Sequence, residues 1–263
     1  MTGAILGAVQ GLTEFLPISS DGHLAIGAIL FGQTDTPLPF VVFLHIGTLV
    51  ATLLVLRAEV GELVSATASG IRSPREFFAT DHGRELAAII AATVPTGVIG
   101  LLLKDFVVAS SNDLRVVGAC LLGSAAMVAS TRFTNHGERN VLGIAPAFFL
   151  GACQALAVLP GLSRSGTTIG VAMLLGLRAP RAFRFSFLLS LPAVAGAVLL
   201  ESTDLAGLEG YGAAALVGSV VAFLFGYVAL KMLRDLLDRG RFWAFALYLF
   251  PLGVGLLLWN PPL

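Results

Sequence analysis

Charged side chains are scarce in this chain of 263 residues. Asp, Glu, Lys and Arg make up 12% of it, against roughly 25% in soluble domains. Acidic and basic residues number 16 each, so the net charge of zero gives no electrostatic signal for a nucleic-acid partner. The hydrophobic share is 56% and the mean hydropathy is +0.89. This composition excludes an ordinary soluble enzyme and predicts an all-α, polytopic membrane protein that forms a single membrane domain, 1–263.

Cysteine is nearly absent as well. The two cysteines, Cys120 and Cys153, both lie within apolar runs of the sequence. We interpret them as packing residues rather than as a disulfide.

Six apolar runs are each close to the roughly 20 residues that cross a bilayer. They are Leu38–Leu56, Leu86–Leu103, Leu114–Thr131, Phe185–Leu200, Tyr211–Leu230 and Phe242–Trp259.

A polar pattern interrupts the apolar sequence twice. LGAVQGLTEFLPISSDGHL begins at Leu6, and LGACQALAVLPGLSRSGTT begins at Leu150. Shifted by 144 residues without a gap, the two match at seven of seventeen positions, where a Gly-, Ala- and Leu-rich chain gives about two by chance. The pattern predicts an internal repeat, with one copy at about 1–131 and the other at about 141–263. Gly, Pro and Ser within each copy are typical of broken membrane helices that meet at a site.

The segments 3–32 and 141–176 are predicted to be re-entrant helical hairpins. Each has turn residues in its middle, and arms of about 14 residues reach only the midplane. Each half of the chain then holds one hairpin and three transmembrane helices. Because three is odd, the second half is inverted relative to the first, and the two polar tips are expected to face each other.

The distribution of Lys and Arg supports this topology. With re-entrant hairpins, thirteen cationic residues fall on one side of the membrane and two on the other; with hairpins that cross completely, the split is nine to six. The positive-inside rule favours the first arrangement and places the thirteen in the cytoplasm. They are Arg57, Arg72, Arg75, Arg84, Arg132, Arg139, Arg178, Arg181, Arg184, Lys231, Arg234, Arg239 and Arg241.

The first tip carries candidate catalytic groups. Gln10 and Glu14 are four residues apart and share a helix face. Glu14 either extends to water at a helix end or, as we expect from its mid-depth position, serves a site. His23 follows Ser20 by three residues and could reach its hydroxyl to form an activated nucleophile, or could simply bond a carbonyl. Ser19 is a further polar group at this tip.

The second tip predicts an anion site. An unpaired Arg at bilayer depth costs at least about 2.5 kcal/mol, so Arg164 needs a partner such as Glu14 or a bound anion. Hydroxyls surround it, and a half-helix begins near Gly166. These hydroxyls belong to Ser163, Ser165, Thr167 and Thr168. Two helix ends and one Arg suit a diphosphate. His45, within the first apolar run, either faces this cavity or packs.

The segments QGLTEFLPISSDGH and PGLSRSGTT, together with RFSFLLSLP at 184–192, resemble the signature motifs of the bacitracin-resistance family of undecaprenyl-diphosphate phosphatases. The resemblance covers almost the whole chain. It implies an inverted repeat with two re-entrant hairpins and a site open to the periplasm. It also implies hydrolysis of undecaprenyl diphosphate to the monophosphate, which recycles the lipid carrier of cell-wall synthesis, and a need for a divalent cation, Mg²⁺ or Ca²⁺.

Carried over by motif, the family's acidic pair falls on Gln10 and Glu14, its serine nucleophile on Ser20 and its histidine on His23. Its phosphate-binding stretch falls on Ser163, Arg164, Ser165 and Thr168. Gln10 replaces a possible acidic metal ligand, which leaves Glu14 as the expected cation ligand. Ser19, Thr167 and Gln154, the repeat counterpart of Gln10, complete the polar residues expected to contact substrate.

The sequence therefore predicts a multi-pass phosphohydrolase of the bacterial inner membrane. Its substrate is a polyprenyl diphosphate lipid, membrane lipids surround it, and no nucleic-acid partner is expected. The alternative is a transporter or flippase for a phosphorylated polyprenyl lipid or an anion, since paired hairpins also occur in transporters. The SSxGH stretch favours the enzyme, because a carrier needs an anion cradle but no nucleophile.

Overall fold

The structure is a computed structural model that describes residues 2–30, 38–110, 113–134, 137–201 and 212–259. In these segments the regular structure is helical, apart from one isolated bridge between Arg139 and Leu177. The helices are α1 Thr2–Phe15, α2 Ser20–Leu30, α3 Leu38–Val55, α4 Arg57–Gly70, α5 Pro74–Phe77, α6 Asp81–Ser110, α7 Leu114–Ser130, η1 Thr131–Phe133, α8 Ile144–Leu156, α9 Arg164–Leu174, α10 Ala179–Glu201, α11 Gly212–Asp238, η3 Phe242–Phe245 and α12 Ala246–Leu258.

The prediction of an all-α polytopic membrane protein is confirmed. Four helical segments, α6, α7 together with η1, α10 and α11, are long and apolar enough to cross a membrane. A fifth span is possible if α3 and α4, which bend by 74° at their junction, form one broken span. The run expected at Phe242–Trp259 is also helical, but it divides into η3 and the 13-residue α12. Of the six segments expected to span, the one at Phe242–Trp259 is a shorter apolar helix, and α3 counts as a span only together with α4.

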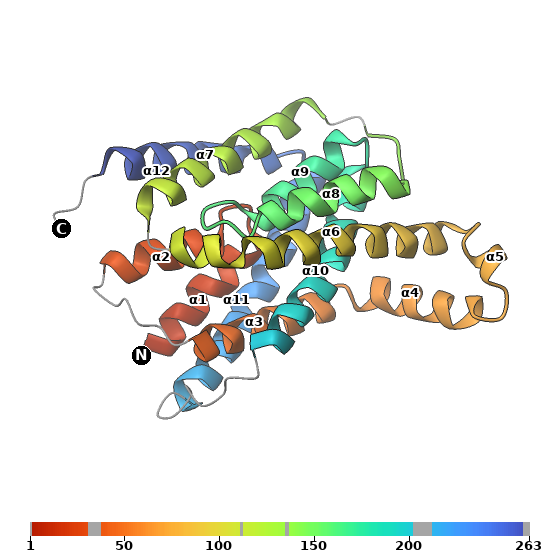
Figure 1. The fold of residues 1–263 in the computed structure, drawn as a ribbon, viewed down its shortest axis with the longest axis horizontal. Helices are drawn as coiled ribbons and strands as arrows, with labels where there is room; N and C mark the ends of the chain where they lie inside the picture. The colour runs from red at the N-terminus through yellow and green to blue at the C-terminus, as the bar shows by residue number, and fades with distance from the viewer. Residues whose placement is uncertain (1, 31–37, 111–112, 135–136, 202–211, 260–263) are drawn as a thin grey trace.

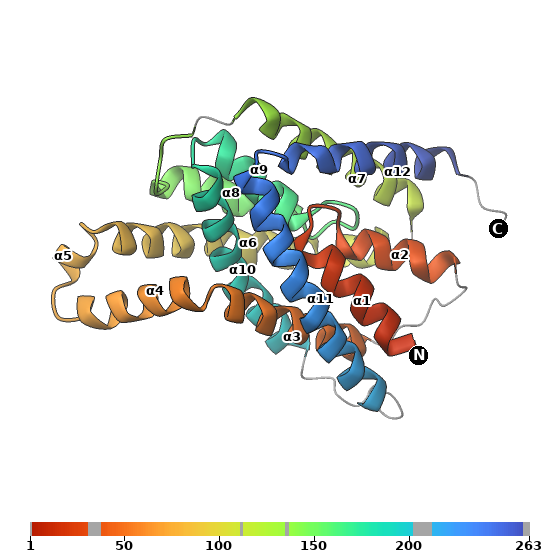
Figure 2. The same cartoon turned by 180° about the vertical axis from the view of Figure 1, so that it is seen from behind.

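The segment between α3 and α6, which lies outside the apolar runs of the sequence, is an ordered helical excursion. In both views α4 and α5 extend away from the rest of the bundle beside the first half of α6 (Figure 1, Figure 2). Arg184 of α10 anchors this excursion to the rest of the protein. Its guanidinium donates to both carboxylate oxygens of Glu85 in α6, at 3.0 and 2.9 Å, and to Glu62 of α4 at 3.0 Å.

Helices of one half of the chain pack against helices of the other half. The first arm of each hairpin packs on a long helix of the other half: α1 on α11, and α8 on α6 (Figure 1, Figure 2). Gly7 and Gly151, matched in the sequence repeat, lie at these contacts. A Cβ on Gly7 would overlap the carbonyl oxygen of Gly218, and one on Gly151 would overlap that of Ala92. Small residues let membrane helices approach this closely.

The apolar core lies where these helices cross. Its fully buried side chains include Leu121 of α7, Leu150 of α8, Phe185 and Leu189 of α10, and Leu230 of α11. The core therefore joins both halves and leaves the two hairpin turns, with their polar residues, packed against each other.

Candidate active site

The first hairpin turns between α1 and α2 through Leu16–Ser19. Ser19 has a φ of 70°, which is unusual for a residue other than glycine. Its hydroxyl accepts a hydrogen bond from the N–H of Gly22 at 3.3 Å, in the first turn of α2. Ser19 thus caps α2 and places Ser20 at the start of this helix.

The second hairpin turns between α8 and α9, and its helix start repeats the first. Ser163 is the N-cap of α9, and its hydroxyl accepts from the N–H of Gly166 at 3.1 Å. The residue pairs Ser19/Gly22 and Ser163/Gly166 are matched in the sequence repeat. The two half-helices therefore begin with the same capping interaction, and Arg164 takes the place in the second that Ser20 has in the first.

The two turns touch, as the sequence predicted. The Ser19 hydroxyl also accepts from the N–H of Gly161 at 3.1 Å, and the Ser165 hydroxyl donates to the carbonyl of Leu16 at 3.3 Å. Gly161 has a φ of +95°, and a Cβ there would overlap the carbonyl oxygen of Val117. Glycine is needed at this contact for both reasons.

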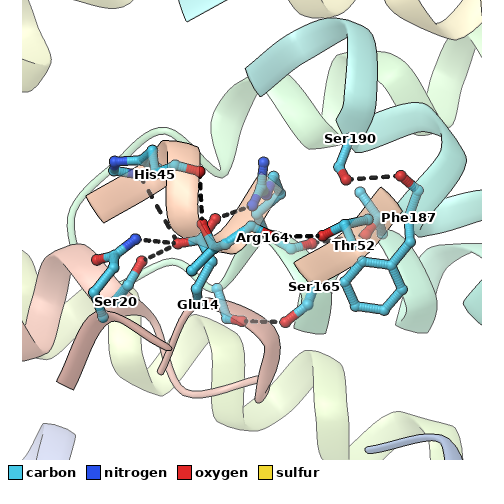
Figure 3. A network of polar contacts seen from close by, with 12 residues as sticks. Glu14, Ser20, His45, Thr52, Arg164, Ser165, Phe187 and Ser190 are labelled. Carbon is cyan, nitrogen blue, oxygen red and sulfur yellow. Dashed lines mark hydrogen bonds and ion pairs between the residues drawn. The ribbon is translucent and has the colours of Figure 1, made fainter. Parts of the chain in front are cut away.

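The Glu14 carboxylate is the centre of the polar cluster (Figure 3). Its Oε2 accepts from Ser20 Oγ at 2.8 Å and from Gln10 Nε2 at 3.0 Å, while its Oε1 is paired with Arg164 Nη2. Gln10 and Glu14 are buried. The predicted grouping of Gln10, Glu14, Ser20 and Arg164 is therefore present, and Glu14 is the group positioned to accept the Ser20 proton.

His45 of α3 is a further member of the cluster. Its Nε2 lies 3.9 Å from Glu14 Oε2, and its Nδ1 bonds the carbonyl of Val41 at 3.0 Å (Figure 3). The side chains of His45 and Arg164 are 25% and 24% exposed, against 6% for Glu14. The side chains of His45 and Arg164 therefore border the accessible side of a buried carboxylate.

Of the two interpretations that the sequence left open for His23, the structure shows the contact with a carbonyl and not the contact with Ser20. The His23 Nδ1 lies 2.8 Å from the carbonyl oxygen of Ser19, and its Nε2 lies 2.7 Å from the hydroxyl of Tyr248 in α12. Ser20 instead donates to Glu14. One turn of α2 carries the His23 ring back toward the residue before Ser20, so the spacing of three residues does not bring the two side chains together.

The remaining hydroxyls of the second tip are mostly engaged with protein. Ser163 and Ser165 share a hydrogen bond of 3.2 Å, and Thr168 bonds the carbonyl of Arg164 and the hydroxyl of Ser186. Thr167 Oγ1 is buried without a hydrogen-bond partner among the described residues. These residues shape the start of α9; their contact with a phosphate stays a prediction.

Gln154 lies elsewhere. Its Nε2 donates to Thr96 of α6 at 3.2 Å, and Thr96 in turn donates to the carbonyl of Gly151. Gln154 therefore joins α8 to α6, whereas its repeat counterpart Gln10 serves the carboxylate. The structure gives no support to the prediction that Gln154 contacts substrate.

Ser124 of α7 is a site residue that the motifs did not reveal. Its fully buried hydroxyl donates to the carbonyl of Gly161 at 3.0 Å and accepts from the N–H of Ser163 at 2.7 Å. It fixes both ends of the turn that leads to Arg164. A serine in an apolar helix is common, so the sequence offered no signal for this role.

The chain is similar to known proteins over nearly its whole length. The sequence profile of the bacitracin resistance protein BacA matches residues 3–255, which include both hairpin turns and most of α12. The chain belongs to this family. An undecaprenyl-diphosphatase of Desulfosudis oleivorans is 44% identical, with 98% of this chain and 97% of the relative covered. Relatives of the same name from Desulforapulum autotrophicum and Bacteroides thetaiotaomicron are 40% and 34% identical.

The family relationship covers the whole architecture rather than a fragment of it. The Desulforapulum autotrophicum protein is covered over 95% of its length and the Bacteroides thetaiotaomicron protein over 96%. The Glu14 cluster, the turn held by Ser124 and the contact between His23 and Tyr248 all lie within the residues matched to the family.

Proposed function

We propose that this chain is an integral membrane phosphohydrolase that converts undecaprenyl diphosphate to the monophosphate and phosphate. The observation that carries the proposal is the hydrogen bond from Ser20 Oγ to Glu14 Oε2, on a carboxylate that also pairs with Arg164. A hydroxyl, a base and a cation meet at two helix starts, and relatives spanning the whole chain are named undecaprenyl-diphosphatase. The product would return the lipid carrier to cell-wall synthesis.

In the first step Ser20 attacks the terminal phosphorus. Its hydroxyl proton passes to Glu14 Oε2, the bond from Oγ to phosphorus forms, and the bond from phosphorus to the bridging oxygen breaks. Undecaprenyl monophosphate leaves with the electron pair of that bond. Glu14 suits the role of base because its Oε2 already accepts the hydrogen bond of the attacking hydroxyl.

In the second step water attacks the phosphoserine and releases phosphate. Glu14 first passes the proton taken from Ser20 to the departing undecaprenyl monophosphate. It then accepts a proton from the attacking water and gives this proton to Ser20 Oγ as the bond from Oγ to phosphorus breaks. Arg164 stabilises the negative charge of the transferred group in both steps. Its contact with Glu14 uses Nη2, whereas a guanidinium has five N–H donors in all. It can therefore hold a phosphate oxygen and Glu14 together.

We propose that a divalent cation would bind together with the diphosphate of the substrate. Among the described residues, no group of three or more His, Cys, Asp or Glu side chains could hold a metal ion. Mg²⁺ is commonly bound through one or two carboxylates together with substrate phosphates. Glu14 would hold it here, and Asp21, which interacts electrostatically with Glu14 and Arg164, lies close by. When bound, the cation would neutralise charge on the diphosphate.

We further propose that the protein lies in the bacterial inner membrane with its site open to the extracytoplasmic side. The support is the thirteen-to-two division of cationic residues, read with the positive-inside rule. The inverted relationship of the two halves is proposed on the same basis.

Phosphate release from undecaprenyl diphosphate by the purified protein tests the function. We expect turnover by the wild type and a loss of about 10²-fold or more in Glu14→Gln, which keeps the size of the side chain but removes the base. Binding of the diphosphate without release of phosphate would contradict the enzyme and favour a carrier. Repeating the assay with a chelator, and then with Mg²⁺ or Ca²⁺ restored, tests the cation.

A further inference from the structure

Tyr248 contacts the site from the far end of the chain. Its hydroxyl lies 2.7 Å from His23 Nε2, across 225 residues of sequence, and the two rings stack with centroids 5.8 Å apart and planes at 17°. Tyr248 belongs to α12, which packs on α7 and lies outside both hairpins. The sequence motifs gave it no role.

The two contacts of His23 define its tautomer. The Ser19 carbonyl oxygen can only accept, so the Nδ1 that faces it at 2.8 Å carries the hydrogen. In the neutral imidazole Nε2 is then an acceptor, and the Tyr248 hydroxyl donates to it. Both ring nitrogens are occupied, which leaves His23 no nitrogen for Ser20.

The carbonyl that His23 holds belongs to a residue with an unusual backbone. Ser19 has a φ of 70°, a conformation that persists at a non-glycine residue only when its surroundings enforce it. Its hydroxyl is held by Gly161 and Gly22, and its carbonyl by His23. The next residue is Ser20, whose hydroxyl must point at Glu14.

We propose that Tyr248 is a positioning residue for the reaction of Ser20. Its hydroxyl keeps the His23 ring oriented with Nδ1–H on the Ser19 carbonyl, and this holds the turn that directs Ser20 Oγ to Glu14. The inference rests on the proposed function and extends the positioning of the nucleophile from the hairpins to the last helix. Small displacements of an attacking group cost large factors in rate.

Tyr248 is poorly placed to act as a packing residue. Its side chain is 47% exposed, and the buried residues of α12 are Leu249, Gly253 and Leu256. Removing only its hydroxyl should therefore leave thermal stability almost unchanged. Unchanged thermal stability in a variant with lower kcat would therefore indicate a positioning role rather than a structural one.

The experiment compares Tyr248→Phe with Tyr227→Phe in purified protein. Tyr227 is a half-buried tyrosine of α11 whose ring lies under Lys231, and it serves as the matched control. We expect Tyr248→Phe to lower kcat by about 10-fold, with KM within about twofold, because a misdirected nucleophile slows chemistry more than binding. In a His23→Ala background the same substitution should have almost no further effect, since coupled residues are not additive.

A readout independent of activity is the ¹⁵N spectrum of the imidazoles, with His23→Ala used to assign the signals of His23. The wild type should show His23 with hydrogen on Nδ1, and Tyr248→Phe should shift its Nε2 signal. An unchanged spectrum, full kcat in Tyr248→Phe, a comparable loss in Tyr227→Phe, or full additivity with His23→Ala would each overturn the proposal. Absence of phosphate release by the wild type would instead refute the proposed function and leave the spectrum to decide this point.

Discussion

Arg164 and Glu14 form an ion pair between two hairpins that are 150 residues apart in the chain. Each residue begins or ends a half-helix, and each would be a costly lone charge if the other hairpin were withdrawn. The pair therefore joins the two halves of the protein at the same place where Ser20 contacts the carboxylate. The proposed active site is therefore complete only when the two halves are packed together.

Arg164→Lys tests whether the planar guanidinium matters beyond its charge. Lysine keeps the cation near Glu14 but loses the fork that binds two oxygens at once. We expect turnover to fall by about 10²-fold or more, as for loss of one electrostatic stabiliser. Phosphate release measured beside Arg181→Lys, a substitution of the same kind at the start of α10, provides the control. Near-normal turnover in Arg164→Lys would mean that Arg164 has a structural role only.

The close glycine contacts between the halves predict that glycine substitutions at a contact and away from it differ in their effect on stability. Gly151→Ala forces a methyl group against the carbonyl of Ala92, whereas the same change at Gly97 of α6 meets no atom within 4 Å among the described residues. We expect Gly151→Ala to destabilise the protein by about 1–3 kcal/mol, and Gly97→Ala to be neutral or slightly stabilising. Thermal unfolding in detergent measures both. Equal melting temperatures would show that α8 and α6 separate without cost.

The sequence predicted the site where a charge or a repeat marked it. Glu14 and Arg164 stood out because ionisable groups are expensive in an apolar setting, and the repeat matches Ser19 with Ser163, the two residues that the structure shows as caps. Ser124 and Tyr248 could not be found in this way. Each is a single polar residue on an apolar helix, and its role depends on which turn the fold brings beside it.

His23 shows the limit of spacing arguments. Three residues along a helix bring side chains to one face, but Ser20 is the first residue of α2 and its hydroxyl turns to Glu14. The ring of His23 instead finds the carbonyl of Ser19 and a partner from α12. Long-range packing decided between the two interpretations that the sequence had left open.

The fold was predictable in class but not in detail. Apolar runs gave the positions of α3, α6, α7, α10, α11 and α12. The helical excursion of α4 and α5 was not foreseen, because this segment is more polar and its anchor, Arg184 on Glu85 and Glu62, joins three distant elements.

Cysteine accessibility tests the topology behind the proposed orientation. In a background with Cys120→Ala and Cys153→Ala, new cysteines at the exposed positions Ser73 and Asp238 should react with an impermeant maleimide from the cytoplasmic side alone. A cysteine at Arg115 should react from outside alone. Ser73 precedes the second hairpin and Asp238 follows it, so the two share a side only if that hairpin is re-entrant. Labelling of Ser73 and Asp238 from opposite sides would refute the inverted arrangement.

Substitution of the two adjacent serines of the first hairpin distinguishes the proposed nucleophile from a residue that stabilises the turn. Ser20 donates to Glu14, whereas the Ser19 hydroxyl accepts from the N–H groups of Gly22 and Gly161. We expect Ser20→Ala to lose about 10³-fold or more in turnover while it still binds substrate. Ser19→Ala should keep far more activity than Ser20→Ala, with turnover lowered by about 10-fold as in Tyr248→Phe. It should also lose about 1–3 kcal/mol of stability, because buried N–H groups lose their acceptor.

Steady-state kinetics, a substrate-binding measurement and thermal unfolding on both variants distinguish these effects. The repeat explains why the two serines should differ so much. Ser19 corresponds to Ser163 and has the same capping contact, while Ser20 corresponds to Arg164, so the halves differ where one supplies the nucleophile and the other the charge. If Ser20→Ala kept more than about a tenth of wild-type turnover, the loss would be too small for a nucleophile. Attack by a water molecule that Glu14 deprotonates would then replace the phosphoserine intermediate, and the contact between Ser20 and Glu14 would serve to hold that carboxylate in place.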